Sequence, residues 1–245
     1  MKKPVRPNLY DYIKIIAIIC MIIAHIGYFL FSGDNWFQVI GRAAFPLFLF
    51  LVGFNSSYRW RWNLWIVAIS LQIGYIVTRY IGLHHVGITL IILINIALVR
   101  VILNFLKRQK VNQSILFLIL LCAWILDSYV RNIIDFGMMA LMYGIVGYSF
   151  VNFKRRWSST AMLFMVSVAY LFHEFIVFDF DILQRLGVIV VVVIVFFLLI
   201  SLGKENRNMK LGRLFDSLIL FISKNALWIY LLHVVVLVIL QWAFQ

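Results

Sequence analysis

The stretch that decides the fold is Leu9–Phe31, which reads LYDYIKIIAIICMIIAHIGYFLF and is almost wholly apolar. A run of this length is typical of a helix that crosses a bilayer, where ionisable side chains are costly to bury. Lys14 and His25 lie inside it, about three helical turns apart, so they share one face at roughly 16 Å along the axis. A cation near one membrane surface and a titratable imidazole near the other indicate a reaction path rather than an anchor.

The composition extends this interpretation to the whole chain. Of its 245 residues, 64% are hydrophobic and only 13% are charged, whereas a soluble domain is about half apolar and a quarter charged. The apolar runs are as long as membrane helices and lack the period-2 alternation of β-barrel strands. The run after the basic N-terminus is too long for a signal peptide, so we expect a retained first span. The predicted fold is all-α, a polytopic integral membrane bundle.

The apolar runs predict nine transmembrane helices, with eight or ten as the alternatives. We expect a single transmembrane domain over residues 1–245, and a short amphipathic helix near 212–222 that lies at the membrane interface. Two full spans after residue 212 would need about 40 apolar residues, and the segment is too short for that. The predicted spans are 9–31, 37–57, 63–82, 87–106, 112–128, 136–152, 158–177, 183–203 and 224–243.

The net charge of +13 is gathered in short clusters between the spans. Every second loop is basic, which is the positive-inside pattern of a bacterial cytoplasmic membrane protein and argues against a nucleic-acid partner. The pattern predicts a cytoplasmic N-terminus and an external C-terminus. The basic clusters are Lys2, Lys3 and Arg6; Arg59 and Arg61; Lys107, Arg108 and Lys110; Lys154, Arg155 and Arg156; and Lys204, Arg207, Lys210 and Arg213.

His25 is the first candidate for chemistry, because a neutral imidazole accepts a proton from an attacking amine or hydroxyl. Lys14 is a candidate for binding an anionic group that enters from the cytoplasm. The structural alternative is a lysine that snorkels to the interface and a histidine that is bonded to a neighbouring helix. Intramembrane ionisable residues favour the functional interpretation.

Two further constellations lie in the second and last spans. Arg42 cannot deprotonate and therefore needs an anion or several acceptors, and Pro46 is expected to open the helix locally. The alternative for Arg42 is an interfacial arginine before a kinked helix. Tyr230 and His233 are three residues apart and share a helix face. For them an interhelical hydrogen bond is as good an explanation as direct chemistry.

A cluster of ionisable residues lies at the outer end of the seventh span. His173, Glu174, Asp179 and Asp181 would bind a cationic acceptor or orient a base, and a solvated loop is the favoured alternative. Their spacing matches no standard metal-ligand motif, so no metal is predicted. The adjacent His84 and His85 are a weaker candidate, because neighbouring residues face different ways on a helix.

The motifs resemble one known family. Lys14 and His25 with Gly27, followed by IGRAAFPLF at residues 40–48, look like the TraX family. The segments Asp135–Gly137, Tyr143–Gly144 and Ile229–His233 are similar to motifs of that family, and the last also to the wider membrane acyltransferase-3 group. TraX proteins usually carry an aspartate directly before the histidine, where this chain has Ala24. The wider group has arginine where Lys14 stands.

The resemblance implies transfer of an acetyl group from acetyl-CoA to a pilin N-terminus, or in the broader group to sugars. We expect an acetyl-CoA-dependent membrane acetyltransferase whose acceptor is a peptide, pilin or glycan amine or hydroxyl. The alternatives are a proton-coupled transporter or channel, and a non-enzymatic scaffold. The oligomeric state stays open, a homo-oligomer included. The expected site residues are His25, His233, Arg42 and Tyr230 for catalysis, Lys14, Arg59 and Arg61 for the cofactor, and Glu174 and Asp179 for the acceptor.

Overall fold

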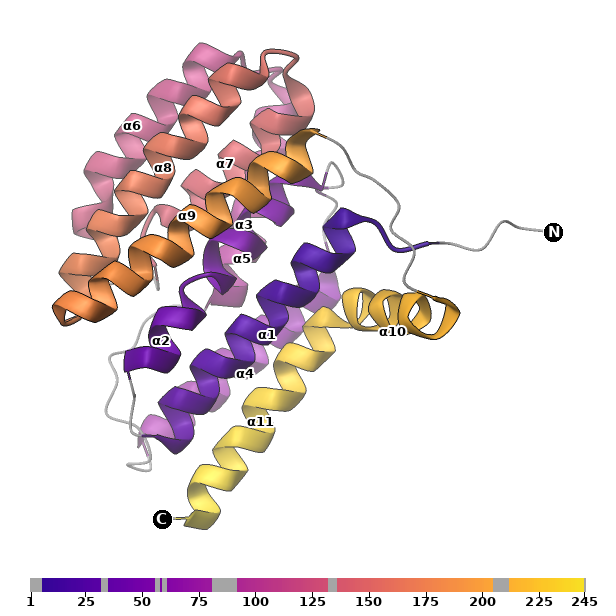
Figure 1. Cartoon of the computed structure of the whole chain (residues 1–245), viewed down its shortest axis with the longest axis vertical. Helices are drawn as coiled ribbons and strands as arrows, with labels where there is room; N and C mark the ends of the chain where they lie inside the picture. The colour runs from indigo at the N-terminus through magenta and orange to yellow at the C-terminus, as the bar shows by residue number, and fades with distance from the viewer. Residues whose placement is uncertain are drawn as a thin grey trace. The chain divides into compact units, whose positions relative to one another are not determined.

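The structure is a computed structural model that describes residues 6–31, 35–55, 58, 61–80, 92–131, 136–204 and 212–244. Every regular element within these ranges is an α-helix (Figure 1), so the all-α prediction is confirmed. The helices are α1 Leu9–Leu30, α2 Asn35–Gly41, α3 Ala44–Phe54, α4 Trp62–Tyr80, α5 Ile92–Arg108, α6 Gln113–Val130, α7 Met139–Asn152, α8 Arg156–Val177, α9 Ile182–Lys204, α10 Arg213–Lys224 and α11 Ala226–Phe244.

Five helices are long and apolar enough to cross a membrane, and a sixth span results if α10 and α11, which are bent by 76°, are taken together. The protein is therefore a multi-pass membrane protein. The count of nine spans stays a prediction, because α4 and α7 contain only shorter apolar helices in the part of the chain that the structure describes. The five spans are Leu9–Leu30, Trp36–Phe54, Gln113–Val130, Arg156–Val177 and Ile182–Leu202.

The second predicted span is interrupted by a turn at Arg42 and Ala43, between α2 and α3. Pro46 is the third residue of α3 and has no N–H to bond the Arg42 carbonyl four residues earlier. The break lies at that carbonyl, as expected for a helix that Pro46 opens locally.

The described residues fall into two compact units, and the expectation of a single domain over 1–245 stays a prediction. The first unit comprises the parts of 1–48 and 175–245 that the structure describes. In it α1 packs against α2, α9, α10 and α11, and α2 packs against α9. Figure 1 shows α1 and α11 side by side, with α10 turned away from the axis of α11. Ile18, Met21 and Ala44 form a buried cluster under Ile222 and Ile229.

The amphipathic helix expected near 212–222 is α10. Its Ile219 and Ser223 are buried, and a row of large apolar side chains on the same helix is exposed. Such a helix cannot cover its apolar side within the unit and is suited to lie in the interface plane of a bilayer. The exposed side chains are Leu214, Phe215, Leu218 and Phe221.

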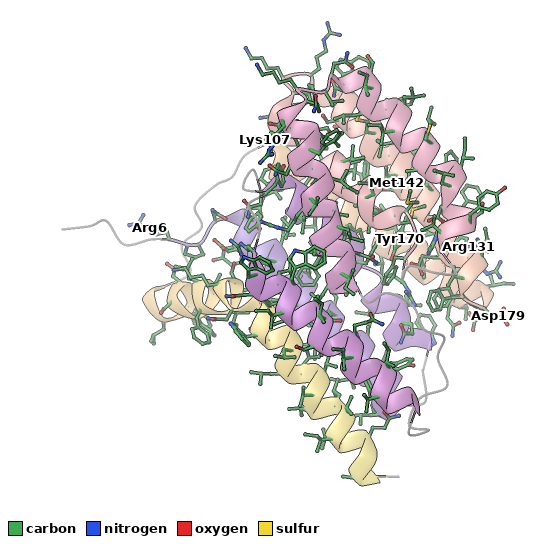
Figure 2. All side chains as sticks on the ribbon, turned by 180° about the vertical axis from the view of Figure 1, so that it is seen from behind. Arg6, Lys107, Arg131, Met142, Tyr170 and Asp179 are labelled. Carbon is green, nitrogen blue, oxygen red and sulfur yellow. The ribbon has the colours of Figure 1, made fainter. Side chains whose placement is uncertain are left out.

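The second unit comprises the described part of residues 49–174. Its centre is α7, which packs against α5 and α6 and is buried on every side. Gly147 and Gly144 have no side chain to keep neighbouring chains away, since a Cβ at either would collide with Phe50 or Val99. Figure 2 labels Met142 on α7 and Tyr170 on α8, and both are fully buried.

Candidate functional site

The central feature of the first unit is a pair of histidines. Nδ1 of His25 on α1 lies 2.7 Å from Nε2 of His233 on α11. The two rings are stacked, with centroids 4.9 Å apart and planes 15° from parallel. Both side chains are half-buried. The structure thus joins the first and the last of the residues expected for catalysis.

The hydrogen bonds of this pair determine which nitrogen carries the proton. Nδ1 of His233 lies 2.9 Å from the carbonyl oxygen of Ile229, one turn earlier on α11. A carbonyl only accepts, so Nδ1 of His233 donates and its Nε2 carries a lone pair in the neutral ring. That lone pair accepts from Nδ1–H of His25. In the neutral pair, the remaining nitrogen of His25, Nε2, therefore has a lone pair and no proton.

A neutral imidazole with a bare Nε2 is a base and a nucleophile near neutral pH. His233 fixes both the tautomer and the plane of the His25 ring, as a carboxylate does for the histidine of a catalytic triad. This answers the question raised by Ala24. The group that orients His25 comes from α11, far along the chain, and no acidic neighbour in sequence is required.

Close packing explains why the residue before His25 is small. A Cβ on Gly41 of α2 would collide with the Cβ of Ala24 on α1, and a Cβ on Gly27 would collide with Phe37. Small residues let membrane helices approach closely. Gln38 adds a hydrogen bond from its Nε2 to the Ala24 carbonyl at 3.3 Å. The α1–α2 contact is therefore close at position 24, where the side chain is a single methyl group.

Tyr230 packs on the histidine pair. Its ring meets the rings of His25 and His233 edge to face, with centroids 6.0 and 5.4 Å away. Phe29 contacts His25 in the same manner at 6.2 Å. Tyr230 and His233 thus share the face of α11 that points to α1, as their spacing predicted.

Arg42 is buried, at 5% exposure, in the turn between α2 and α3. Its guanidinium lies 3.7 Å from the ring centroid of Phe178 and 5.8 Å from that of Phe180. It also donates to Oε1 of Gln38 at 3.2 Å, the side chain that reaches the Ala24 carbonyl. The contacts described for Arg42 are therefore aromatic faces and an amide, and a catalytic role for it stays a prediction.

Lys14 faces the junction of α10 and α11. Its Nζ donates to the carbonyl oxygen of Ser223 in the last turn of α10, where a cation is favoured by the helix dipole. The Ser223 hydroxyl donates to Oδ1 of Asp11 at 2.6 Å. Lys14 and His25 both contact the α10–α11 pair, so the shared face predicted for them is confirmed.

The second unit holds a small basic cavity of about 90 Å³ between the start of α4 and the second half of α5. Of the two arginines expected to bind a cofactor, Arg61 lines this cavity, and Arg59 lies outside the described residues. Burial raises the pKa of Tyr58, so its hydroxyl stays neutral and the cavity keeps the charge of its arginines. The lining residues are Tyr58, Arg61, Leu64, Trp65, Ala97, Arg100, Val101 and Asn104.

Sequence reasoning missed Arg100, which lies inside the predicted span 87–106. It is 8% exposed and belongs to the buried face of α5 together with Asn95. The signal was available, because an arginine within an apolar run is as costly as the lysine and histidine that were singled out.

The acidic candidates have different environments. Asp179 is exposed (Figure 2), as the solvated-loop interpretation requires. His173 and Glu174 on α8 are buried, at 4% and 0% exposure, so that interpretation was wrong for them. Neighbouring helices enclose them, which the sequence could not show. His84 and His85 lie outside the described residues.

The partner of His173 is a residue that no sequence motif marked. Its Nδ1 lies 2.7 Å from Oδ2 of Asp127 on α6, and Asp127 is itself 5% exposed. Met138 donates its backbone N–H to the other carboxylate oxygen at 2.8 Å. Gly137 has φ +51°, and a Cβ there would strike that oxygen, so the turn closes on Asp127 only with glycine.

Comparison with known proteins gives one family. A family model described as TraX protein matches residues 10–241. The uncharacterized protein RP591 of Rickettsia prowazekii is 35% identical over 68 residues, which is 28% of this chain and 27% of that protein. The similarity thus spans about a quarter of each chain. No solved structure matches the chain.

Proposed function

Because the chain belongs to the TraX family, we propose that it is an integral membrane acetyltransferase. It moves the acetyl group of acetyl-CoA to an amine or hydroxyl, such as a pilin or peptide N-terminus or an envelope sugar. The observation that carries the proposal is the His25–His233 pair, whose hydrogen bonds leave Nε2 of His25 unprotonated. An imidazole held in that state is suited to acyl transfer.

Two routes use the same atom. As an acyl carrier, Nε2 of His25 attacks the thioester carbon, the C–S bond breaks and CoA leaves as the thiolate, while the Nδ1 proton passes to Nε2 of His233. The acceptor then attacks the acetyl-imidazole, the proton returns from His233 to Nδ1 of His25, and the acceptor's own proton neutralises the CoA thiolate. As a general base, Nε2 takes the acceptor proton while the acceptor displaces the thiolate, which then receives that proton.

The developing oxyanion needs a hydrogen-bond donor. The Tyr230 hydroxyl is the first candidate, because its ring packs against both histidines. Arg42 is the second, through its connection by Gln38 to the backbone beside His25. A fixed donor in a site that excludes water stabilises a transition-state charge far more than the same donor in water.

The proposed topology has nine spans in the bacterial cytoplasmic membrane, with the N-terminus inside. Basic loops then face the cytoplasm, where acetyl-CoA is available, and Lys14 and Arg61 are the proposed contacts for its charged end. The thin pantetheine arm can enter between helices, whereas the nucleotide stays near the surface. Glu174 and Asp179 are proposed to attract a cationic acceptor, and no metal takes part.

The test is acetyl transfer by purified protein in lipid nanodiscs, measured with radiolabelled acetyl-CoA and an acceptor peptide or glycan. His25→Ala should lower the rate by roughly 10²–10⁴ if His25 is the base, and abolish transfer if it carries the acetyl group. A trapped acetyl-imidazole on a His25 peptide would identify the carrier route.

His84→Ala is the matched control, a histidine that has no part in the proposed chemistry. Full activity of His25→Ala at equal thermal stability would refute the mechanism. Proton flux into liposomes without acetyl-CoA turnover would favour a transporter instead.

A further inference from the structure

The basic cavity of the second unit contains a charge that the chemistry of His25 does not use. Arg100 lies on α5 with Ala97, Val101 and Asn104 on the same face, at i, i+3, i+4 and i+7 spacing. It is 8% exposed. A guanidinium cannot deprotonate to escape burial, so an arginine at this depth in an apolar helix needs acceptors or a negative charge around it.

The opposite wall supplies a second guanidinium. Arg61 precedes α4, is exposed, and lines the cavity with Trp65 one turn later. Tyr58 also lines the cavity, and its hydroxyl donates to the Gly53 carbonyl. Lys107 lies 5.7 Å from the Tyr58 ring centroid (Figure 2 labels this lysine near the end of α5). No carboxylate lines the cavity among the residues that the structure describes.

The size and the donors of the cavity select its ligand. About 90 Å³ holds several waters, which suits one phosphate group and not a whole nucleotide. Arginine presents planar, paired donors that match phosphate oxygens. Asn104 adds an amide donor.

We infer that Arg61, Arg100 and Asn104 form a phosphate-binding site that takes one phosphate of an organic phosphate ligand. The assignment of that phosphate to the nucleotide end of the acyl donor rests on the proposed function. A phospholipid headgroup carries the same chemistry and is the other source. The site makes Arg100, which no sequence motif marked, an anion-binding residue.

Binding is measured without turnover, by calorimetry of CoA and of adenosine 3′,5′-bisphosphate with protein in phosphatidylcholine nanodiscs. Arg100→Gln should weaken binding roughly ten- to hundredfold, as expected for loss of a charged hydrogen bond. Arg108→Gln, an exposed arginine on the same helix, is the control and should change little. Arg100→Lys keeps the charge without the paired donors and replaces Arg100→Gln if that variant does not fold.

The salt dependence of binding distinguishes the contributions of Arg61 and Arg100. The exposed Arg61 is screened, so the effect of Arg61→Gln should shrink as ionic strength rises, whereas the effect of Arg100→Gln should persist. Unchanged CoA affinity in both Arg100 variants, with no lipid effect, would overturn the site. CoA binding that needs Arg100 in a protein without acetyl transfer would leave the site standing and remove the proposed function.

A second experiment with anionic lipid distinguishes the nucleotide from the phospholipid headgroup as the source of the phosphate. In phosphatidylglycerol nanodiscs, native mass spectrometry counts the lipids that remain bound after release. Retention of lipid by the wild type and loss by Arg100→Gln, together with no CoA binding, would support the phosphate site and assign it to a headgroup. Active protein in which Arg100→Gln alters neither lipid retention nor CoA affinity would refute it.

Discussion

At the scale of single residues, the proposed chemistry depends on which nitrogen atoms of two histidine rings carry a proton. Nδ1–H of His233 donates to the Ile229 carbonyl, so Nε2 of His233 has no proton. That Nε2 accepts a hydrogen bond from Nδ1–H of His25. The free nitrogen of His25 follows from these two hydrogen bonds. His233 is in this view a positioning residue, because it acts through His25.

This role predicts a graded response at position 233. His233→Leu removes the acceptor and should lower acetyl transfer, but by less than the roughly 10²–10⁴ expected for His25→Ala. His233→Gln keeps an oxygen acceptor on α11 and should recover part of the rate. The measurement is kcat and KM of both variants in nanodiscs at matched thermal stability.

A purely structural role would lower stability and leave the rate per folded molecule unchanged. Equal rates for His233→Leu and His233→Gln would therefore contradict the positioning role. Loss of transfer in His233→Leu alongside full activity in His25→Ala would move the reaction centre to α11.

Contacts of single residues also explain the second histidine site, at His173. The Asp127 carboxylate accepts hydrogen bonds from Nδ1–H of His173 and from the Met138 N–H. Asp127 and His173 are forty-six positions apart in the sequence. Phe136, with φ +60°, is a non-glycine residue in the left-handed region, where strain accumulates at turns that the surrounding structure enforces. The turn at Phe136–Met138 thus positions the Met138 N–H for its hydrogen bond to the Asp127 carboxylate.

At the scale of elements, the contact between α1 and α2 positions His25. Gly41, the last residue of α2, packs against Ala24, and Gly27 packs against Phe37. Gln38 donates to the Ala24 carbonyl and accepts a hydrogen bond from Arg42. Close approach of the two backbones is possible only because the side chains at the crossing are small. The residue next to the catalytic candidate is therefore selected for its size.

Adding one carbon at this crossing should be costly. Gly41→Ala places its Cβ against that of Ala24, and overpacking of this kind costs about 1–3 kcal/mol. Gly74→Ala is the matched control, a glycine within α4 whose added Cβ would meet nothing within 4 Å. It should be neutral or stabilise by about 0.5–1 kcal/mol, because alanine favours the helix.

Thermal unfolding of both variants in the same detergent measures the difference. If Gly41→Ala unfolds at or above the wild-type midpoint, the packing described for α1 and α2 is incorrect. The same variant should also lower acetyl transfer, because it displaces the element beside His25.

At the scale of the whole molecule, charge is distributed for orientation and each unit has its own polar centre. The first unit contains the His25–His233 pair. The second contains the basic cavity and the Asp127–His173 hydrogen bond. Basic loops alternate with loops that carry few cations, which orients a membrane protein during insertion.

The alternation predicts which loops a reagent reaches. In a background with Cys20 and Cys122 replaced by alanine, a membrane-impermeant thiol reagent should label Asp179→Cys in intact cells. Arg108→Cys and Arg155→Cys should be labelled only after the membrane is opened. All three positions are exposed in the structure, so burial cannot explain a difference. Labelling of Arg108→Cys from outside would invert the proposed topology.

The sequence by itself determined the class of the protein and the positions of its helices. Apolar runs must be helical in a bilayer, since no water satisfies the backbone there, and their lengths located α1 and α9 to within a few residues. His25 and Lys14 stood out for the same reason, because charge is costly in that solvent.

Only the tertiary structure decided which polar groups meet. The partner of His25 is 208 positions away, and that of His173 is 46 positions away. The burial of Arg100 also depends on neighbouring helices. Hydrogen bonds need donor–acceptor distances of about 3 Å. The periodicity of a sequence predicts which residues share one side of a helix, but it does not predict which other helix packs against that side.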